Sequence, residues 1–350
     1  MAGTVKRATG PYQINRPKGH VEMAGGSGYK DRKPKDPDGS HITWWHAVMG
    51  HPGDRTAARM LENGLGEING VKITKKMYGQ GNVWCDACAK GKCKRSPHKA
   101  RKRADEGWPD RPNMLHAFDS TGRMLKSWWG HQYSTIIKDH HDGKTWTYAH
   151  SKKDHLPRVL AHHEHVAKID GRLTKAFHEL GGIHDLRVMA YRSDNAPEVK
   201  HPGELARRRL EGIASEWTVP NDGHGQQNAV AERGIGLTRT IANILIHSNM
   251  HNLSDRQARR LWPYAHQHAA HLQLLWPTQH NQGGAAPGEK RYAAGKGSNN
   301  ENWRSRLLHV WGSRMIVRRE DSEFKKHELR GRSVYYLGVP TSFGPGYLGW

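Results

Sequence analysis

Two histidines and two cysteines near the start of the sequence have the residue types and spacing of a metal site. His46 and His51 lie in the stretch HITWWHAVMGH (41–51), and Cys85 and Cys88 form a Cys-x-x-Cys pair. Zinc takes about four nitrogen or sulfur ligands in a tetrahedron, and a Cys-x-x-Cys turn brings two thiolates to one ion. We therefore predict a zinc site formed by these four residues. Four protein ligands leave no position for water, so its role would be structural.

The same residues have an alternative explanation, because the sequence contains 26 histidines and chance pairs of histidines are common in it. In that case they are ordinary buried or surface side chains beside an unreactive pair of thiols. The cysteines favour the metal site, since there are only three and two of them share one Cys-x-x-Cys. His41 and Cys93 are spare donors that we do not expect to be ligands. So few cysteines also exclude a disulfide scaffold and are typical of a reducing compartment.

Three acidic residues further along could form a second, catalytic metal site. Asp119 ends a short apolar stretch (113–120), Asp194 ends the stretch LRVMAYRSD (186–194), and Glu232 lies in a helical stretch. Carboxylates at strand ends and on a facing helix can meet at one point, where their oxygens suit Mg²⁺ or Mn²⁺. Two such ions about 4 Å apart activate a nucleophilic oxygen and stabilise the leaving oxygen in phosphodiester displacement.

These acids also have simpler explanations. An aspartate at the end of a strand is commonly a turn or cap residue, and an exposed helical glutamate is commonly only solvated. The surroundings favour the catalytic interpretation, since the chain is basic, a zinc site is predicted before the acids, and the polar runs RSDN and GQQN lie beside them.

The elements that would position these acids follow a mixed α/β order. Two β-rich runs, 132–139 and 145–150, flank Asp142-Gly143, a dipeptide typical of hairpin turns. Apolar residues then recur at three- and four-residue steps over 156–180, as on one face of a long helix. Further along we predict a strand over 186–194, a helix over 203–214 and a short strand over 216–219. This order predicts a mixed α/β sheet with helices on its faces.

A loop and a helix over 223–250 carry Glu232. At 100° per residue, Glu232 and Arg239 share one face of this helix, opposite Val230. The predicted apolar stripe consists of Val230, Leu237, Ile241, Ile244 and Leu245, and Gly236 and Asn243 belong to the polar face. We expect a second amphipathic helix over 255–276, and strands over 310–319 and 331–339.

The charge balance indicates a polyanionic partner. Lysine and arginine total 55, and aspartate and glutamate total 33, so the formal charge is 55 − 33 = +22. Nucleic acid is the first candidate for such a chain. No apolar run approaches the roughly 20 residues of a membrane helix, and the polar N-terminus lacks a secretory h-region. The basic run over 90–103 is explained equally well as a solvated tether or as a phosphate-contacting surface.

The motifs occur in the order of a known family. WWHAVMGHP followed by CDACAKGK resembles the zinc-binding pre-integrase segment of Ty1/copia-type retrotransposon polyproteins. FDSTG, RSDNAPEV and GQQNAVAER resemble, in order, the three acidic motifs of the retroviral-type integrase core. LWPYA (261–265), HVWGSRMIV (309–317) and GRSVYYLGV (331–339) are similar to segments that follow this core. The resemblance spans residues 41–350.

The resemblance implies an RNase H-like core, which is a mixed five-stranded sheet flanked by helices. It implies that Asp119, Asp194 and Glu232 are catalytic and bind Mg²⁺ or Mn²⁺, and that the His/Cys cluster binds zinc. The activity would be that of an integrase, a polynucleotidyl transferase and endonuclease that processes the 3′ ends of element DNA and joins them to target DNA. Both steps are in-line transesterifications without a covalent enzyme intermediate, so the protein would act by positioning and charge stabilisation.

Three residues near Glu232 are candidates for DNA contact. Arg239 could contact a phosphate from the same helical face. Gln226 and Asn228 could shape the loop or touch DNA, although capping of the helix N-terminus explains them slightly better. The resemblance also implies DNA as the partner, a homo-oligomer when active, and a nuclear location, with which the basic run KARKR (99–103) is compatible.

Two positions depart from the family pattern. Ala196-Pro197 stand where two glycines usually follow the Asp-Asn of the second motif, and Ala229 replaces the glycine after Gln-Gln-Asn. Both changes reduce backbone freedom beside catalytic residues, although neither removes a ligand. They favour, as the alternative to an active integrase, a catalytically inactive nucleic-acid-binding remnant of a retroelement polyprotein. A nuclease of the same fold that cuts RNA in hybrids is a third hypothesis, against which the zinc segment argues.

Five parts are expected along the chain. They are a basic disordered tail over 1–40, a small helical zinc-binding pre-integrase module over 41–95, a basic linker over 96–111, an integrase catalytic core with trailing helices over 112–280, and a small C-terminal β-rich unit over 281–350.

Overall fold

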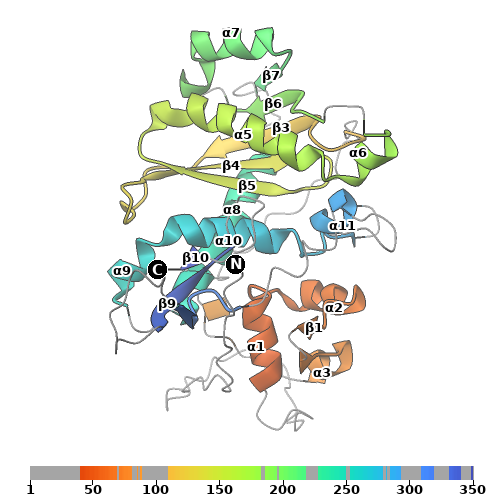
Figure 1. Cartoon of the computed structure of the whole chain (residues 1–350), viewed down its shortest axis with the longest axis vertical. Coiled ribbons are helices and arrows are strands. Elements are labelled where there is room, and N and C mark those ends of the chain that lie inside the picture. Colours follow the sequence, from red (N-terminus) through yellow and green to blue (C-terminus); the bar gives the residue numbers. More distant parts are fainter. Residues whose placement is uncertain are drawn as a thin grey trace, which may run out of the picture.

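The largest sheet among the described residues has five strands, which lie in the upper half of Figure 1. The computed structural model describes residues 40–68, 71–80, 85, 87–88, 109–182, 186–194, 197–217, 228–249, 253–278, 281, 284–292, 309–318, 331–339 and 348–349. The predicted tail up to residue 39, the basic run over 90–103 with Cys93, and Gln226 lie outside these residues. In the described part of the chain, no helix is long and apolar enough to span a membrane.

Short elements form the N-terminal module. They are α1 (Ser40–Val48), α2 (Asp54–Glu62), β1 (Glu67–Ile68), β2 (Val71–Lys72) and α3 (Lys75–Gln80). The strands β1 and β2 pair antiparallel. Ala57 and Met60 are buried on one side of α2, so its apolar spacing faces the rest of the protein. The helices α2 and α3 fall within the small helical module expected over 41–95, and α1 begins one residue before it.

The sheet combines an antiparallel meander with two parallel strands. Its members are β3 (Leu115–Ser120), β4 (Tyr133–Asp139), β5 (Thr145–His150), β6 (Ala190–Ser193) and β7 (Ala214–Trp217), in the order β5-β4-β3-β6-β7. The strands β3, β4 and β5 pair antiparallel, and β6 and β7 continue the sheet parallel to β3. Gly143 has a φ of 82°, which suits the predicted hairpin dipeptide. The prediction of a mixed five-stranded α/β sheet is confirmed.

Helices cover both faces of this sheet. After β5 come η1 (Lys153–His155), α5 (Leu156–Gly171) and α6 (Lys175–Glu179); after β6 come η2 (Pro197–Lys200) and α7 (Pro202–Leu210); and after β7 comes α8 (Ala229–Asn249). Leu156 and Leu160 of α5 pack into a core with Phe118 and Ile137. On the other face, α8 packs against β4: a Cβ atom added at Gly234 would lie 3.8 Å from Ile136, an ordinary van der Waals distance. Each face therefore has its own helix.

The apolar stripe over 156–180, predicted as one long helix, forms two helices. Helix α5 ends at Gly171, and α6 begins after Thr174, whose side-chain oxygen accepts the backbone N–H of Phe177 at 3.2 Å. A Cβ at Gly171 would come within 2.6 Å of the carbonyl oxygen of Leu186, so the close approach requires glycine. The prediction of one continuous helix was wrong because a capping threonine starts a new helix there.

The helix predicted over 255–276 is also divided, into α9 (Asp255–Arg259) and α10 (Trp262–Gln273). A capping box between Ser254 and Gln257 starts α9. Pro263 lies in the first turn of α10, where its missing N–H costs no hydrogen bond. The periodicity was correct, but the local capping signals set the boundaries.

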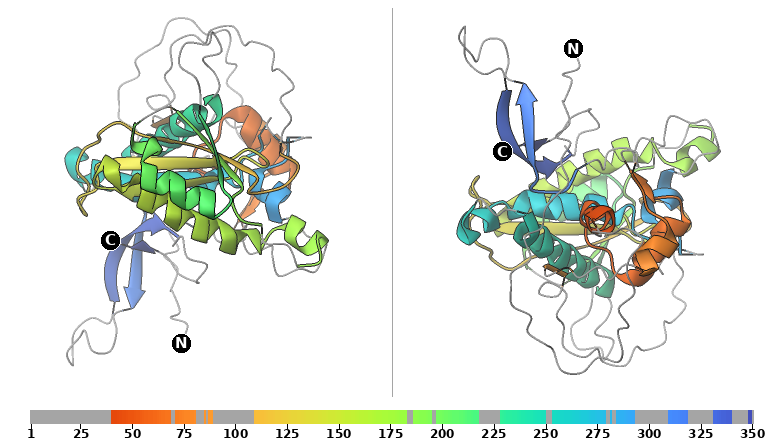
Figure 2. Two further views of the ribbon diagram at one scale, coloured as in Figure 1. Left: turned by 90° about the horizontal axis from the view of Figure 1, so that it is seen from above. Right: turned by 90° about the horizontal axis from the view of Figure 1, so that it is seen from below.

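The last described strands form a small antiparallel sheet. It consists of β8 (Arg314–Arg318), β9 (Gly331–Gly338) and β10 (Leu348–Gly349), in the order β10-β9-β8. Figure 2 shows this sheet extending away from the larger one. The two strands predicted here correspond to β8 and β9. Before them lies α11 (Pro287–Tyr292), a short helix that was not expected.

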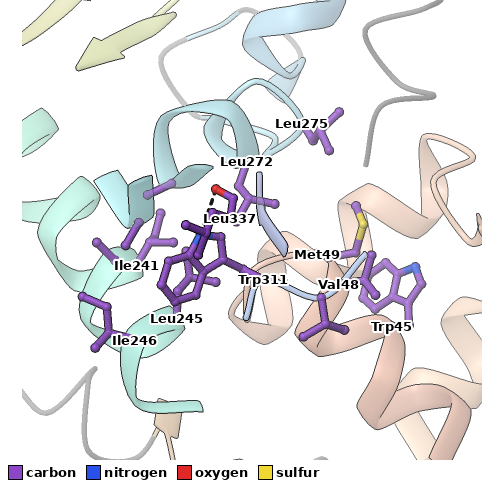
Figure 3. Close-up of a cluster of buried hydrophobic side chains, with 14 of the residues drawn as sticks. Trp45, Val48, Met49, Ile241, Leu245, Ile246, Leu272, Leu275, Trp311 and Leu337 are labelled. Atoms are coloured by element: carbon purple, nitrogen blue, oxygen red, sulfur yellow. Dashed lines mark hydrogen bonds between the residues drawn. The ribbon is translucent and has the colours of Figure 1, made fainter. Parts of the chain in front are cut away.

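One hydrophobic core joins the N-terminal module to the helices α8 and α10 and to the C-terminal sheet (Figure 3). Trp45 of α1 and Met49, which directly follows α1, share this core with Leu245 of α8 and Leu272 of α10. Trp311, completely buried, donates its indole N–H to the carbonyl of Leu337 at 3.1 Å. The core is therefore continuous across the boundaries expected between the zinc module, the catalytic core and the C-terminal unit.

Candidate metal centre and catalytic site

The four predicted zinc ligands meet at one place in the N-terminal module. The ligand atoms of His46, His51, Cys85 and Cys88 all lie within 4.8 Å of one another. His46 Nε2 is 3.2 Å from Cys88 Sγ, and His51 Nδ1 is 3.2 Å from Cys85 Sγ. Zinc bonds of about 2.0–2.3 Å place the ligands of a tetrahedron roughly 3.6 Å apart, which is close to this spacing. The cluster can therefore bind zinc.

The backbone after α1 brings the two histidines together. His46 lies in the last turn of α1, and the chain then turns through Gly50 and His51, whose φ values are 74° and 60°. A Cβ at Gly50 would lie 2.2 Å from Cδ1 of Leu272, so both the conformation and the available space require glycine there. The packing of α1 against α10 thus sets the position of His51.

The surroundings of the thiols favour their metal-binding form. The pKa of Cys85 is lowered mainly by its hydrogen bond with Cys88. Hydrogen bonds from His46 and His51 lower it further, and together these bonds outweigh burial, which acts to raise the pKa. His46 Nδ1 is 3.1 Å from the Tyr78 hydroxyl, which leaves Nε2 directed at the thiols. A second partner of this kind orients a ligating imidazole.

Asp119 is the last but one residue of β3, and Asp194 directly follows β6, the parallel strand beside it. The register pairs Ala117 of β3 with Arg192 of β6, and one further step of two residues along both strands leads to Asp119 and Asp194. Residues two apart share a face, and adjacent strands lie about 4.8 Å apart. Asp119 is also the cross-strand partner of Ile136, so this is the face that α8 covers.

Glu232 lies in the first turn of α8, on the helix that covers that face, and it is exposed. Asn228, directly before α8, is buried and donates its side-chain amide to the carbonyl of Phe118 at 3.3 Å. The carbonyl of Asn228 in turn accepts the backbone N–H of Glu232 at 3.1 Å. Asn228 thus connects the start of α8 to the residue before Asp119. The side chain of Asn228 is therefore engaged within the protein, and its contact with DNA stays a prediction.

The electrostatics of Asp119 show that the three acids are neighbours. The pKa of Asp119 is raised to about 6, mainly by burial and further by the negative charges of Asp194, Glu232 and Glu198. The backbone N–H of Ser120, 2.6 Å from Oδ1 of Asp119, acts in the opposite direction. Glu198, in the 3₁₀ turn η2, was not singled out in the sequence, although it lies four residues after Asp194 in the same motif.

The acids are less tightly gathered than the zinc ligands. Among the residues that the structure describes, the His/Cys cluster is the one group of three or more potential ligands this close together. Asp119, Asp194 and Glu232 form no second group of that kind. Residues 195–196, between Asp194 and η2, and the loop before Asn228 lie outside the described residues.

Comparisons with known proteins give a structural match of low similarity. No family model and no curated protein matches the sequence. The chain is similar to a chain in the solved structure of the simian T-cell lymphotropic virus intasome in complex with PP2A regulatory subunit B56 gamma, with 17% sequence identity and a TM-score of 0.32. The match covers 61% of this chain and 64% of that one, so it spans less than two thirds of the neighbour's length. Function therefore has to be inferred from the residues of this chain.

The polar face predicted for α8 is exposed as expected. Glu232, Gly236, Arg239 and Asn243 are all exposed. Arg239 also lies near α10, because its charge adds to burial in lowering the pKa of His266 to about 4. Of the predicted apolar stripe, Ile241, Ile244 and Leu245 are buried, whereas Val230 is half-buried and Leu237 is 36% exposed. The helix is therefore most open at its N-terminal part, beside the acids.

A buried charged network was missed entirely in the sequence. Arg291 of α11 is completely buried, and its guanidinium bonds to the carboxylates of Asp139, Asp142 and Asp170. Asp142 had been interpreted only as half of a hairpin dipeptide. Because these partners are distant in sequence, no local spacing signals their contact.

Proposed function

We propose that this chain is an integrase-type polynucleotidyl transferase, which processes the 3′ ends of element DNA and joins them to target DNA. The observation that carries the proposal is the place of Asp119 near the end of β3 and of Asp194 directly after the adjacent parallel strand β6, with Glu232 on the helix over the same face. The strand order and directions support an RNase H-like core, because they are those of a mixed five-stranded sheet with helices on both faces.

Asp119, Asp194 and Glu232 would hold two Mg²⁺ or Mn²⁺ ions. Their donor set fits, since hard carboxylate oxygens are what these ions prefer. The raised pKa of Asp119 also fits, because a partly buried carboxylate beside other carboxylates lacks the compensating positive charge that a cation supplies. When bound, such ions activate the attacking oxygen and stabilise the leaving oxygen in phosphodiester displacement.

The remaining residues would act by positioning. Asn228 holds Glu232 at a set distance from the end of β3, and Arg239, on the same side of α8, could contact a DNA phosphate. The zinc cluster would fix the turn at His51, which packs against α10 through Gly50. The net charge of +22 favours binding of the DNA backbone.

Two further features belong to the proposal. Joining two element ends to one target requires two active sites, so the protein would act as a homo-oligomer. It would act in the nucleus, where chromosomal DNA lies.

The direct test is joining of a labelled DNA end to a plasmid in the presence of Mg²⁺ or Mn²⁺. The wild-type chain should give joined product, and Asp194→Asn should give none, because it removes a ligand with little change in shape. Glu179→Gln, an exposed acid on α6, is the matched control and should join normally. Equal product from Asp194→Asn and the wild type would overturn the assignment.

A second candidate, a non-catalytic DNA-binding remnant, is favoured by one observation. The three acids form no compact ligand group among the described residues, and Ala196-Pro197 stand beside Asp194. This candidate expects DNA affinity that falls steeply with salt, without any metal-dependent cleavage or joining. Metal-dependent joining that Asp194→Asn abolishes would exclude it.

A further inference from the structure

The loop over 121–132 begins two residues after Asp119 and forms a hairpin of its own. The backbone N–H of Met124 donates to the carbonyl of Gln132 at 2.8 Å, and that of Ser127 to the carbonyl of His131 at 2.9 Å. The buried hydroxyl of Ser127 also accepts the backbone N–H groups of Trp129 and His131. These bonds give the loop a defined shape beyond the end of the sheet.

The same loop is fastened to the junction of α9 and α10. Trp128 donates its indole N–H to the carbonyl of Gln257 at 3.3 Å, and Trp262 donates its indole N–H to the carbonyl of Leu125 at 2.8 Å. The Arg260 guanidinium lies 4.0 Å above the ring of Trp128 and donates to the carbonyl of Lys126 at 3.3 Å. The loop is therefore held as part of a rigid surface and not as a free tether.

This fastened surface leaves large apolar side chains in solvent. Trp129 is 47% exposed and Leu125 is 44% exposed. The ring of Trp129 contacts Tyr264 of α10 edge to face, with 4.8 Å between ring centroids. Tyr264 itself is half-buried, so it supports the ring of Trp129 while that ring stays exposed. A large exposed aromatic side chain that is rigidly held in this way is typical of a binding surface.

The two segments that carry the aromatic pair are rich in positive charge. Residues 121–132 and 254–264 together contain five arginines and lysines, which are Arg123, Lys126, Arg256, Arg259 and Arg260. They contain one acid, Asp255, and its carboxylate already pairs with Arg259 at 2.7 Å. The surface therefore combines the exposed ring of Trp129 with a clear excess of cations.

We propose that this cationic–aromatic surface, formed by Leu125, Lys126, Trp129, Arg256, Arg260 and Tyr264, binds single-stranded DNA, with a base stacked on Trp129. Cations that follow the backbone and rings that accept a base are the two elements of single-strand recognition. Duplex DNA offers the same phosphates but no open base faces along its length, so the exposed ring of Trp129 favours an unpaired strand. The inference rests on the proposed function, since the loop starts beside the acids and an unpaired strand at a processed DNA end is the segment it would hold.

The test is fluorescence anisotropy with a labelled oligothymidylate and the full chain, without divalent metal, so that no chemistry is involved. Trp129→Ala should weaken binding about 5- to 150-fold, which corresponds to the roughly 1–3 kcal/mol of one stacked base. Trp129→Phe should stay within a few-fold of the wild type because it keeps a ring. Lys126→Ala should weaken binding and make it less sensitive to salt.

Two controls make the outcome decisive. Leu210→Ala and Arg209→Ala, on exposed positions of α7, should leave single-strand affinity unchanged.

Unchanged single-strand affinity in Trp129→Ala would overturn the proposal, as would an equal loss of affinity for a blunt duplex. Stronger binding of a single-stranded RNA of matched length would overturn the assignment to DNA. None of these results depends on strand joining, so failure here and failure of Asp194→Asn to abolish joining can be told apart.

Discussion

Arg291 Nη1 lies 2.8 Å from Oδ2 of Asp139, and both side chains are completely buried. The two residues are 152 positions apart, one in α11 and the other at the end of β4. The same guanidinium is 2.6 Å from Asp142 and 2.7 Å from Asp170. Asp139 pairs with His116 near the start of β3, so the network fixes α11 at the end of the sheet away from Asp119.

Arg291→Met should destabilise the protein strongly. The change removes the cation that three buried carboxylates share, and breaking a buried ion pair from one side costs about 3–5 kcal/mol. Burial raises the pKa of Asp142 even with Arg291 present, so without the guanidinium the cluster would take up protons. Urea denaturation at neutral pH, followed by circular dichroism, measures the free energy of unfolding. The matched control is Arg172→Met, which changes an exposed arginine after α5 and should leave the free energy of unfolding nearly unchanged. If Arg291→Met lowers the free energy of unfolding as little as Arg172→Met does, the prediction is wrong.

Much of the fold followed from the sequence because local patterns specify it. The strands over 132–139 and 145–150 appear at nearly the predicted positions, since β-rich runs flank a hairpin dipeptide. The helix ends were less accurate, because Thr174 and Pro263 start new helices inside periodic stretches. Capping and proline chemistry act over a few residues and override the longer apolar period.

The site was predictable to different degrees. The His/Cys cluster could be recognised from scarce cysteines in a short motif, and the ligand atoms of its four residues do gather. The catalytic roles of Asp119, Asp194 and Glu232 stay a prediction, although register and charge make them neighbours. The Arg291 network and the shared core of Trp45 with Leu272 could not be foreseen, because both join segments more than a hundred residues apart.

Removal of zinc should destabilise the helices beside the acids as well as the N-terminal module. The His51 turn packs on Leu272 through Gly50, and the same core contains residues of α8. Cys88→Ser should lose bound zinc, measured by atomic emission, and its Tm should fall by several degrees. In a domain of this size, each kcal/mol lost lowers Tm by about 2–4 °C.

The spare donors provide the controls for the zinc experiment. Cys93→Ser and His41→Ala should keep both zinc and Tm, because neither residue is an expected ligand. A chelator should lower the Tm of the wild type to that of Cys88→Ser. Full zinc occupancy in Cys88→Ser would show that the cluster is not the zinc site.

Asn228→Ala should slow strand joining about 10- to 100-fold while leaving DNA affinity nearly unchanged. Asn228 anchors the start of α8 to the carbonyl of Phe118, and small displacements of catalytic groups are costly to rate. The lost hydrogen bond should lower stability by about 1 kcal/mol. Joining rates and anisotropy with duplex DNA separate positioning from DNA contact. Asn243→Ala, at an exposed position of α8, is the control and should have the joining rate and DNA affinity of the wild type. If Asn228→Ala loses DNA affinity as much as it loses joining rate, Asn228 contacts DNA directly.

Two buried histidines of α10 should make the protein sensitive to mild acid. Burial is the main reason why the pKa of His266 is lowered to about 4, and the charge of Arg239 adds to it. Burial likewise lowers the pKa of His268 to about 3, with a smaller contribution from the charge of His271. Both side chains stay neutral in the folded protein, whereas in the unfolded chain they take up protons below their ordinary pKa of 6.5. The unfolded state thus binds more protons, and stability falls as the pH drops below about 6.5.

Between pH 7 and pH 5, each of these histidines should contribute about 2 kcal/mol to the loss of stability. Urea denaturation at the two pH values measures the difference in the free energy of unfolding. His268→Gln should reduce that difference by about 2 kcal/mol, because it removes one proton uptake on unfolding. His165→Gln, at an exposed position of α5, should leave the difference unchanged. If His268→Gln and the wild type lose the same stability between pH 7 and pH 5, His268 is not the group that titrates on unfolding.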